Sequence, residues 1–155
     1  MKPSAGCRAL LKRFEGKSNK AYRVEYVCHG KTTYDCAFYT IGYGHCGPDV
    51  KPDDWWSDSK CEEVLQKDLE KFSESFNKIL DENHITLTQN QFDALLSFTY
   101  NIGIGNFQRS TMFKKLVDGD IAGAVVQFNR WVYDGGVVRK GLVERRKQER
   151  TLFES

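Results

Sequence analysis

The chain has 155 residues with a formal net charge of +2, and 40% of them are hydrophobic and 28% charged. This composition is typical of one ordinary globular domain and excludes an intrinsically disordered chain. A charge balance so close to zero is weak for a nucleic-acid-binding protein, so no nucleic-acid partner is expected. No apolar run reaches the length of a transmembrane helix, and the first residues lack the apolar core of a signal peptide.

The first expected element is a helix over residues 4–15, ended by Gly16. Its apolar face consists of Cys7, Leu10, Leu11 and Phe14. Residues 20–46 are rich in Tyr, Val, Thr, Phe and Gly, with turn residues His29, Gly30 and Lys31 in the middle. This pattern predicts an antiparallel hairpin or small sheet.

Two capping boxes mark the helices that follow. Ser59 with Glu62 predicts the start of a long helix that runs to about residue 82, and Thr88 with Gln91 predicts the start of another, broken at Gly103. Shorter helices are expected at about 110–117, 121–132 and 141–153, with Asp120 as a cap and a loop at Gly135-Gly136.

This order of elements predicts an α+β fold, because strands come early and helices follow without the alternation that a parallel sheet needs. We expect a single domain over residues 1–155. It would consist of a small β-hairpin lobe at about 17–56 and a larger helical lobe at about 83–155 with the N-terminal helix. The long helix would join the two lobes, and a cleft between them is the expected binding site.

Basic residues are concentrated near the C-terminus, with Glu144 and Glu149 among them. They are Arg139, Lys140, Arg145, Arg146, Lys147 and Arg150. Two interpretations stand side by side: a mild cationic patch that suits an anionic polymer such as a bacterial wall, or a solvated helix face.

Glu15 is the first candidate for chemistry, because it is placed where the first helix ends, next to the apolar Phe14. A negative charge at a helix C-terminus is unfavourable, and so is ionisation beside apolar groups. Both effects favour the protonated form that a general acid requires. The alternative is a surface glutamate paired with Arg13 or Lys17.

The segment Thr40-Ile41-Gly42-Tyr43-Gly44-His45 alternates as a strand does, and its two glycines allow backbone or ligand to approach closely. Together with other motifs, it resembles the phage-type lysozymes, glycoside hydrolase family twenty-four. The resembling segments are Phe14-Glu15-Gly16, Ala21-Tyr22, Thr40 to His45, Leu87 to Leu95, Asn101-Ile102-Gly103, Arg130-Trp131, Gly135-Gly136 and Gly141-Leu142-x-x-Arg145-Arg146-x-x-Glu149.

The resemblance implies a lysozyme-like fold and an endolysin that hydrolyses the β-1,4 bond between N-acetylmuramic acid and N-acetylglucosamine in peptidoglycan. It implies Glu15 as the catalytic acid and Thr40 as the residue that positions the attacking water, with inversion at the anomeric carbon. Inversion needs a second carboxylate far enough away to leave room for that water.

The second carboxylate is where the chain departs from the family pattern, which places an aspartate where Val24 or Tyr34 stands here. Asp35 is the favoured candidate, because it lies near the end of the hairpin, where a bulge can re-aim it. Glu25 and Cys36 are the alternatives.

Several aromatic and polar residues are candidates for sugar contacts. The resemblance implies substrate binding by Tyr100, Asn101 and Ser110, for which helix packing and capping are the alternative. Trp55 and Trp56 either stack on sugars or, as we favour, anchor the loop before the long helix. His45 is expected to be a structural, hydrogen-bonded histidine.

The five cysteines lack the spacing of a zinc site, so no metal and no cofactor is expected. Cys28 and Cys36 could bridge the hairpin in an oxidising compartment, or the thiols could all be free. The expected partner is peptidoglycan, with no membrane insertion and a monomeric chain. Synthesis in the host cytoplasm and action on the periplasmic or extracellular wall after release are expected. A lytic transglycosylase and a catalytically silent wall-binding module are the alternative functions.

Overall fold

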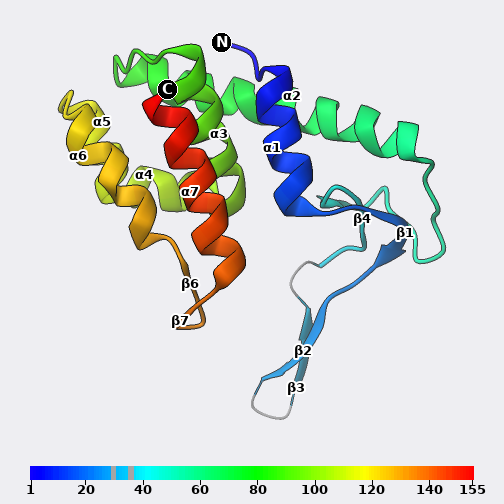
Figure 1. Cartoon of the computed structure of the whole chain (residues 1–155). Coiled ribbons are helices and arrows are strands. Elements are labelled where there is room, and N and C mark those ends of the chain that lie inside the picture. Colours follow the sequence, from blue (N-terminus) through cyan, green and yellow to red (C-terminus); the bar gives the residue numbers. More distant parts are fainter. Residues whose placement is uncertain (29–30, 35–36) are drawn as a thin grey trace. The chain divides into compact units, whose positions relative to one another are not determined.

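The computed structural model describes residues 1–28, 31–34 and 37–155, with the backbone alone for 25–28 and 31–34. These residues form two compact units. The helical unit consists of Met1–Phe14 and Glu70–Ser155, and the sheet unit consists of Glu15–Leu69. The helices and small antiparallel sheets are shown in Figure 1 and confirm the predicted α+β class.

The sheet unit contains a three-stranded antiparallel sheet in the order β1-β4-β5. Its strands are β1 (Ser18–Tyr22), β4 (Thr40–Gly42) and β5 (His45–Cys46). The predicted hairpin is present as β2 (Glu25–Cys28) paired with β3 (Lys31–Tyr34). Strand β4, in the middle of the larger sheet, therefore places its residues between two neighbours.

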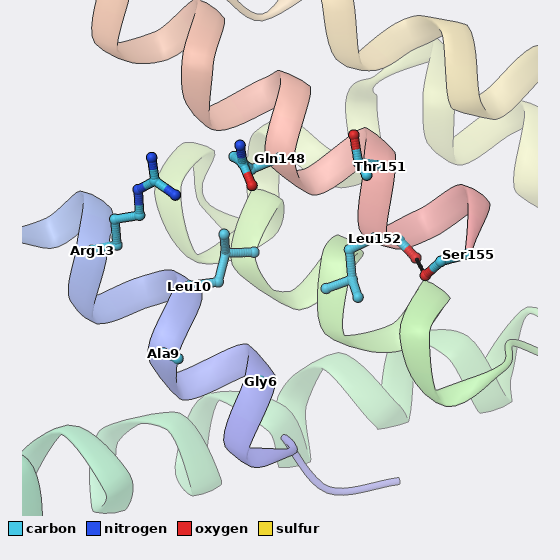
Figure 2. Close-up of a pocket in the computed structure, with 8 residues that line it drawn as sticks. All are labelled: Gly6, Ala9, Leu10, Arg13, Gln148, Thr151, Leu152 and Ser155. Atoms are coloured by element: carbon cyan, nitrogen blue, oxygen red, sulfur yellow. Dashed lines mark hydrogen bonds between the residues drawn. The ribbon is translucent and has the colours of Figure 1, made fainter.

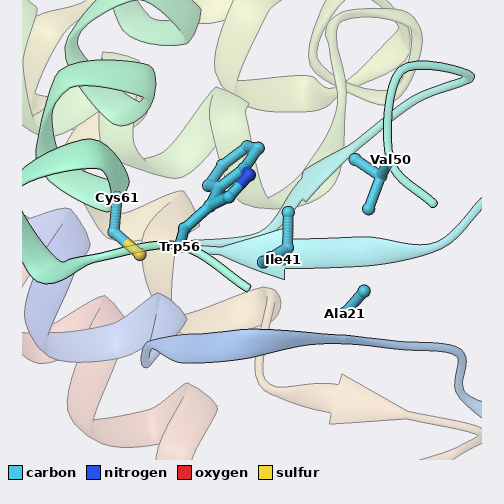
Figure 3. Packing of buried hydrophobic residues seen from close by; sticks show 5 residues of the cluster. All are labelled: Ala21, Ile41, Val50, Trp56 and Cys61. Carbon is cyan, nitrogen blue, oxygen red and sulfur yellow. The ribbon is translucent and has the colours of Figure 1, made fainter. Parts of the chain in front are cut away.

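One face of this sheet carries the core of the unit (Figure 3). The core consists of Ala21, Ile41, Val50, Trp56 and Cys61. Ile41 is fully buried, and the Trp56 ring lies so close to Gly42 that a Cβ there would come within 3.3 Å of it. Glycine is required at this position, since its φ of 68° is also in the left-handed region.

In the helical unit, α1 (Ala5–Glu15) begins where the Ser4 hydroxyl accepts a hydrogen bond from the Cys7 N–H, and it buries Cys7 and Leu11. The other helices are α3 (Gln89–Ile102), α4 (Ile104–Arg109), α5 (Thr111–Val117), α6 (Ile121–Val125) and α7 (Lys140–Glu154), with a 3-10 turn η1 (Val126–Arg130). A cluster of aromatic rings fills the core between them, including Phe76, Phe92, Phe98, Phe107 and Phe128.

Helix α2 (Asp58–Glu82) contributes residues to both units. Its predicted end at about residue 82 is confirmed, but the predicted capping residue Ser59 is wrong. The hydroxyl that accepts from the first turn belongs to Ser57, which bonds the Lys60 N–H at 3.2 Å. Ser57 and Ser59 are equally good cap residues by type, so the pattern alone does not say which of the two is used.

Elsewhere the turn signals were better guides. Thr88 and Gln91 form the predicted capping box of α3, and Asp120 caps α6 by accepting from the Gly123 N–H. Two elements were not predicted: α4, and the hairpin of β6 (Tyr133–Asp134) with β7 (Val137–Val138) around Gly135-Gly136. Among the described residues, no helix has the length and hydropathy needed to cross a bilayer.

The interpretation of the C-terminal charges as a solvated helix face is wrong for Arg145, Arg146 and Glu149, which are at most 3% exposed. Glu149 accepts hydrogen bonds from the Ser97 hydroxyl at 2.7 Å, from the Arg145 Nε at 3.0 Å and from Arg146. These groups join α7 to α3. The cluster lies inside the helical unit because each charge has a partner there.

Candidate active site

Glu15 is the last residue of α1, and Gly16 ends the helix with a φ of 68°. The Glu15 side chain is half-buried. Its Oε2 lies 3.6 Å from the position that a Cβ at Gly44 would occupy. Gly44, with a φ of 87°, lies in the turn between β4 and β5. The carboxylate therefore lies beside the one residue of this turn, Gly44, that has no side chain.

Thr40 is the first residue of the same β4–β5 hairpin and pairs with Tyr22 on β1 and with Cys46 on β5. Successive side chains of a strand point to opposite faces, and the next residue, Ile41, is buried in the core. The Thr40 side chain thus lies on the face of the sheet away from the core. Tyr22, its 41% exposed partner, lies on that face too.

Glu15 and Thr40 both belong to the sheet unit, so one compact body holds both predicted groups. The favoured second carboxylate, Asp35, lies outside the described residues, as does the alternative Cys36. The backbone of Glu25 is described in β2, opposite Tyr34. Val24, which occupies the place of the family's aspartate, is 45% exposed.

His45 is held between two carboxylates. Its Nδ1 lies 2.7 Å from the Asp68 Oδ2 on α2, its Nε2 lies 3.0 Å from the Asp49 Oδ2, and its ring contacts Trp56. Burial lowers the pKa of His45, but the hydrogen bonds and charges of Asp68 and Asp49 outweigh burial, so the pKa is raised. The expected hydrogen bonding of His45 is confirmed, although neither carboxylate partner was predicted from the sequence.

A second pair of charges connects the start of β1 to α2. The Lys17 ammonium donates to Asp58 at 2.6 Å, and the Asn19 amide donates to the same carboxylate at 2.8 Å. The hydrogen bond from Lys17 lowers the pKa of Asp58. Lys17, one of the proposed surface partners of Glu15, is thus bonded to Asp58.

The three predicted substrate-binding residues lie in the helical unit. Tyr100 packs edge-on against Phe72, with ring centroids 5.2 Å apart. Asn101 is exposed and accepts a hydrogen bond from Arg146. Ser110 is only 6% exposed, and its hydroxyl caps α5 by accepting from the Phe113 N–H while donating to the Phe107 carbonyl at 2.6 Å.

Asn101 also lines a pocket of about 490 Å³ in the helical unit. The other lining residues include Asn106, Trp131, Tyr133, Asp134 and Arg139. This mixture of amide, aromatic and charged groups suits a polar polymer. Of the three predicted residues, the structure brings Asn101 to this pocket, whereas Ser110 is used within its helix junction.

A different groove, of about 430 Å³, lies between α1 and α7 (Figure 2). Its lining is Gly6, Ala9, Leu10, Arg13, Gln148, Thr151, Leu152 and Ser155. These side chains include no carboxylate, so they offer no acid–base pair for glycoside hydrolysis. The groove is therefore not the candidate active site.

The cysteines divide into two kinds. Cys46 is disulfide-bonded, whereas Cys7 and Cys61 are buried free thiols. The side chains of Cys28 and Cys36, which were predicted to pair or stay free, are outside the described ones. Within the described part of the chain, no cluster of three potential ligands for a metal ion is found.

A comparison with known protein families identifies the family of this chain. The family model named Phage lysozyme matches residues 12–149, which is most of the chain and includes Glu15 and Thr40. The chain belongs to the phage lysozyme family. This match confirms the resemblance that the sequence motifs indicated.

Relatives and solved structures agree with the family. The endolysin of Bacillus phage PZA is 43% identical over 94% of this chain and 52% of its own length. An endolysin of Acyrthosiphon pisum secondary endosymbiont phage 1 is 34% identical over 94% of this chain and 93% of its own. The muramidase domain of SpmX from Asticaccaulis excentricus superposes with a TM-score of 0.84 at 30% identity, over 99% of this chain and 98% of that one.

The chain spans about half the length of the Bacillus phage endolysins that it matches, 51% and 52%. The lysozyme-like α+β fold is confirmed over essentially the whole chain by the structural likeness.

Proposed function

We propose that the chain is an endolysin that hydrolyses the β-1,4 bond between N-acetylmuramic acid and N-acetylglucosamine in bacterial peptidoglycan. The observation that supports this most directly is the Glu15 carboxylate beside Gly44, in the same compact unit as Thr40. Membership of the phage lysozyme family supports the same reaction.

In the proposed reaction, Glu15 donates its proton to the glycosidic oxygen of the leaving sugar. A water held by the Thr40 hydroxyl attacks the anomeric carbon from the opposite side, and a carboxylate takes the proton that the water loses. Asp35 is the proposed carboxylate, with Glu25 and Cys36 as the alternatives. The balance is one water added for each bond broken, with inversion at the anomeric carbon, and these residues need no cofactor.

Tyr100 and Asn101 are proposed as substrate-binding residues of the helical unit, where Asn101 lines a pocket of mixed polar and aromatic character. Ser110 would act by holding the junction of α4 and α5, because its hydroxyl is already engaged twice there. We propose a monomer that acts on the periplasmic or extracellular wall after release from the host cytoplasm, without binding nucleic acid or inserting into the membrane.

The test is the clearing of purified peptidoglycan by the full chain and by Glu15→Gln. Loss of a general acid should lower the rate by about 10²–10⁴-fold without a change in circular dichroism. The matched control is Glu82→Gln, because Glu82 is likewise the last residue of its helix, α2, but belongs to the other unit. Unchanged clearing by Glu15→Gln would refute the assignment of the acid.

A companion set of Asp35→Asn, Glu25→Gln and Cys36→Ser identifies the second group. We expect Asp35→Asn to be the slow variant. If one of the other two is slow instead, that residue takes the role of base.

The products and the binding of peptidoglycan together separate the hydrolase from the two alternatives. Hydrolysis gives a reducing end, whereas a lytic transglycosylase gives a 1,6-anhydro end that is one water lighter. A wall-binding module would sediment with peptidoglycan and release no sugar. Either of these results would replace the proposed reaction.

A further inference from the structure

Two adjacent tryptophans in the sheet unit have opposite surroundings. Trp56 is 6% exposed and packs in the core with Ile41 and Cys61 (Figure 3), so it is the anchor that the sequence predicted. Trp55 is 68% exposed, the largest exposed fraction among the large hydrophobic side chains of the described part of the chain. The fold does not use the Trp55 indole for packing, and the prediction that it anchors the loop is wrong.

Backbone hydrogen bonds fix the face on which Trp55 lies. Trp55 pairs with Lys20 of β1 in an isolated antiparallel bridge. The Ala21 N–H donates to the Asp54 carbonyl at 2.9 Å, and the Trp56 N–H donates to the Asn19 carbonyl at 2.7 Å. These bonds flank the pair, so Lys20 and Trp55 form a non-hydrogen-bonded pair, in which side chains are closest together.

The same face carries Thr40. Ala21 and Trp56 point into the core, so their neighbours Tyr22 and Trp55 point to the other side of the sheet. Tyr22 is the strand partner of Thr40. The β1–β4 register shifts between Ser18 and Tyr22, but Lys20 and Tyr22 are both exposed on either side of the buried Ala21. Trp55, Lys20, Tyr22 and Thr40 therefore lie on the face away from the core.

We propose that Trp55 and Lys20 extend the glycan-binding site of the sheet unit, with the exposed indole stacking on a sugar ring and the Lys20 ammonium pairing with a carboxylate of the same strand. The C–H groups of a sugar face are apolar and pack well against a large aromatic ring. Peptidoglycan carries carboxylates on its peptides, and on the lactyl group of any muramic acid that lacks a peptide, which suits the exposed cation. This inference rests on the proposed function, since the glycan would also reach Thr40.

The test compares kcat and KM on soluble peptidoglycan strands for the full chain and its variants. Trp55→Ala should raise KM by about tenfold and leave kcat within about twofold, because the proposed stacking holds the sugar equally before and during the reaction. Trp55→Phe should recover most of the loss. The control Val117→Ala, which truncates an exposed side chain of the helical unit, should match the wild type.

Neutral and charged ligands separate the two contacts. In a Glu15→Gln background, where no bond should break, Trp55→Ala should weaken binding of both an N-acetylglucosamine hexamer and peptidoglycan strands. Lys20→Gln should weaken binding of peptidoglycan strands alone, and less so at high salt. Strands stripped of peptides carry lactyl carboxylates in place of peptide carboxylates: a lost Lys20 effect shows that the peptide is the partner, and a persisting effect shows that a lactyl carboxylate also serves.

The binding experiment keeps this inference separate from the proposed reaction. If the wild-type chain cuts no peptidoglycan but binds it through Trp55, the reaction is refuted and the binding face stands. If Trp55→Ala binds and cuts as the wild type does, the binding face is refuted and the reaction stands. A wild-type chain that neither binds nor cuts refutes both.

Discussion

Two glutamates, one in each unit, show how differently this molecule uses a carboxylate. Glu149 in the helical unit is fully buried and bonded to Ser97, Arg145 and Arg146. Glu15 in the sheet unit is half-buried at a helix end, beside Gly44, which has no side chain. The bonds around Glu149 join α7 to α3 and serve stability, whereas the role proposed for Glu15 is to reach a substrate beside Gly44.

The largest expected effect tests the structural side of this comparison. Glu149→Gln would remove the buried negative charge to which both Arg145 and Arg146 donate, so the free energy of unfolding should fall by about 3–5 kcal/mol. The melting midpoint should fall by roughly 10 °C. Glu144→Gln, on the same helix but 44% exposed by side chain, is the control and should change little. Similar losses in both variants would show that the buried cluster is not special.

A smaller effect tests the functional side. Gly44→Ala places a methyl group 3.6 Å from the Glu15 Oε2 at a residue with a φ of 87°. The left-handed backbone should cost about 1–2 kcal/mol of stability, and activity should fall further because the methyl occupies the space beside the acid. Gly119→Ala, with a φ of 73° and no neighbour within 4 Å of its Cβ, carries the backbone cost alone. Equal activity of the two variants would contradict the proposed role of that space.

The smallest effect concerns pH. The raised pKa of His45 means that its ion pairs stabilise the sheet unit fully below pH 6.5, and that this contribution is lost as pH rises through the pKa of the folded state. The lowered pKa of Asp49 acts oppositely: its contribution is present above pH 3.8 and lost on acidification. Urea unfolding from pH 5 to 9 should show a decline of about 1 kcal/mol or less, typical of a part-exposed pair. Asp68→Asn should flatten this decline, and an unchanged slope would exclude the His45–Asp68 pair as its source.

Local signals in the sequence predicted those parts of the fold that depend on neighbours in the chain. The capping box at Thr88 and the glycine after Glu15 are examples, because both act within one helical turn. The family motifs also located Glu15 and Thr40. A match of chain spacing could not do the same for the second carboxylate, since the hairpin here is longer than the family pattern.

Burial was predicted less well, because it depends on what packs against a residue from elsewhere in the chain. Arg145 and Glu149 read as ordinary surface charges until Ser97 on α3 supplies their hydrogen bonds. Trp55 and Trp56 are the same residue type in adjacent positions, and only the pairing with β1 decides which of them enters the core. Lys20 on β1 lies more than thirty residues from Trp55 along the chain, and Ser97 lies 48 residues from Arg145.

The two buried thiols allow the local opening of each unit to be measured. Burial and then the charge of Asp93 raise the pKa of Cys7 to about 12 in the helical unit, and burial raises the pKa of Cys61 in the sheet unit. A thiolate is the reactive form, so a maleimide can modify either sulfur only while its surroundings are briefly open. The two labelling rates can be measured separately from the masses of the labelled peptides. They would report how often each unit opens locally around its thiol, and no cysteine would have to be introduced.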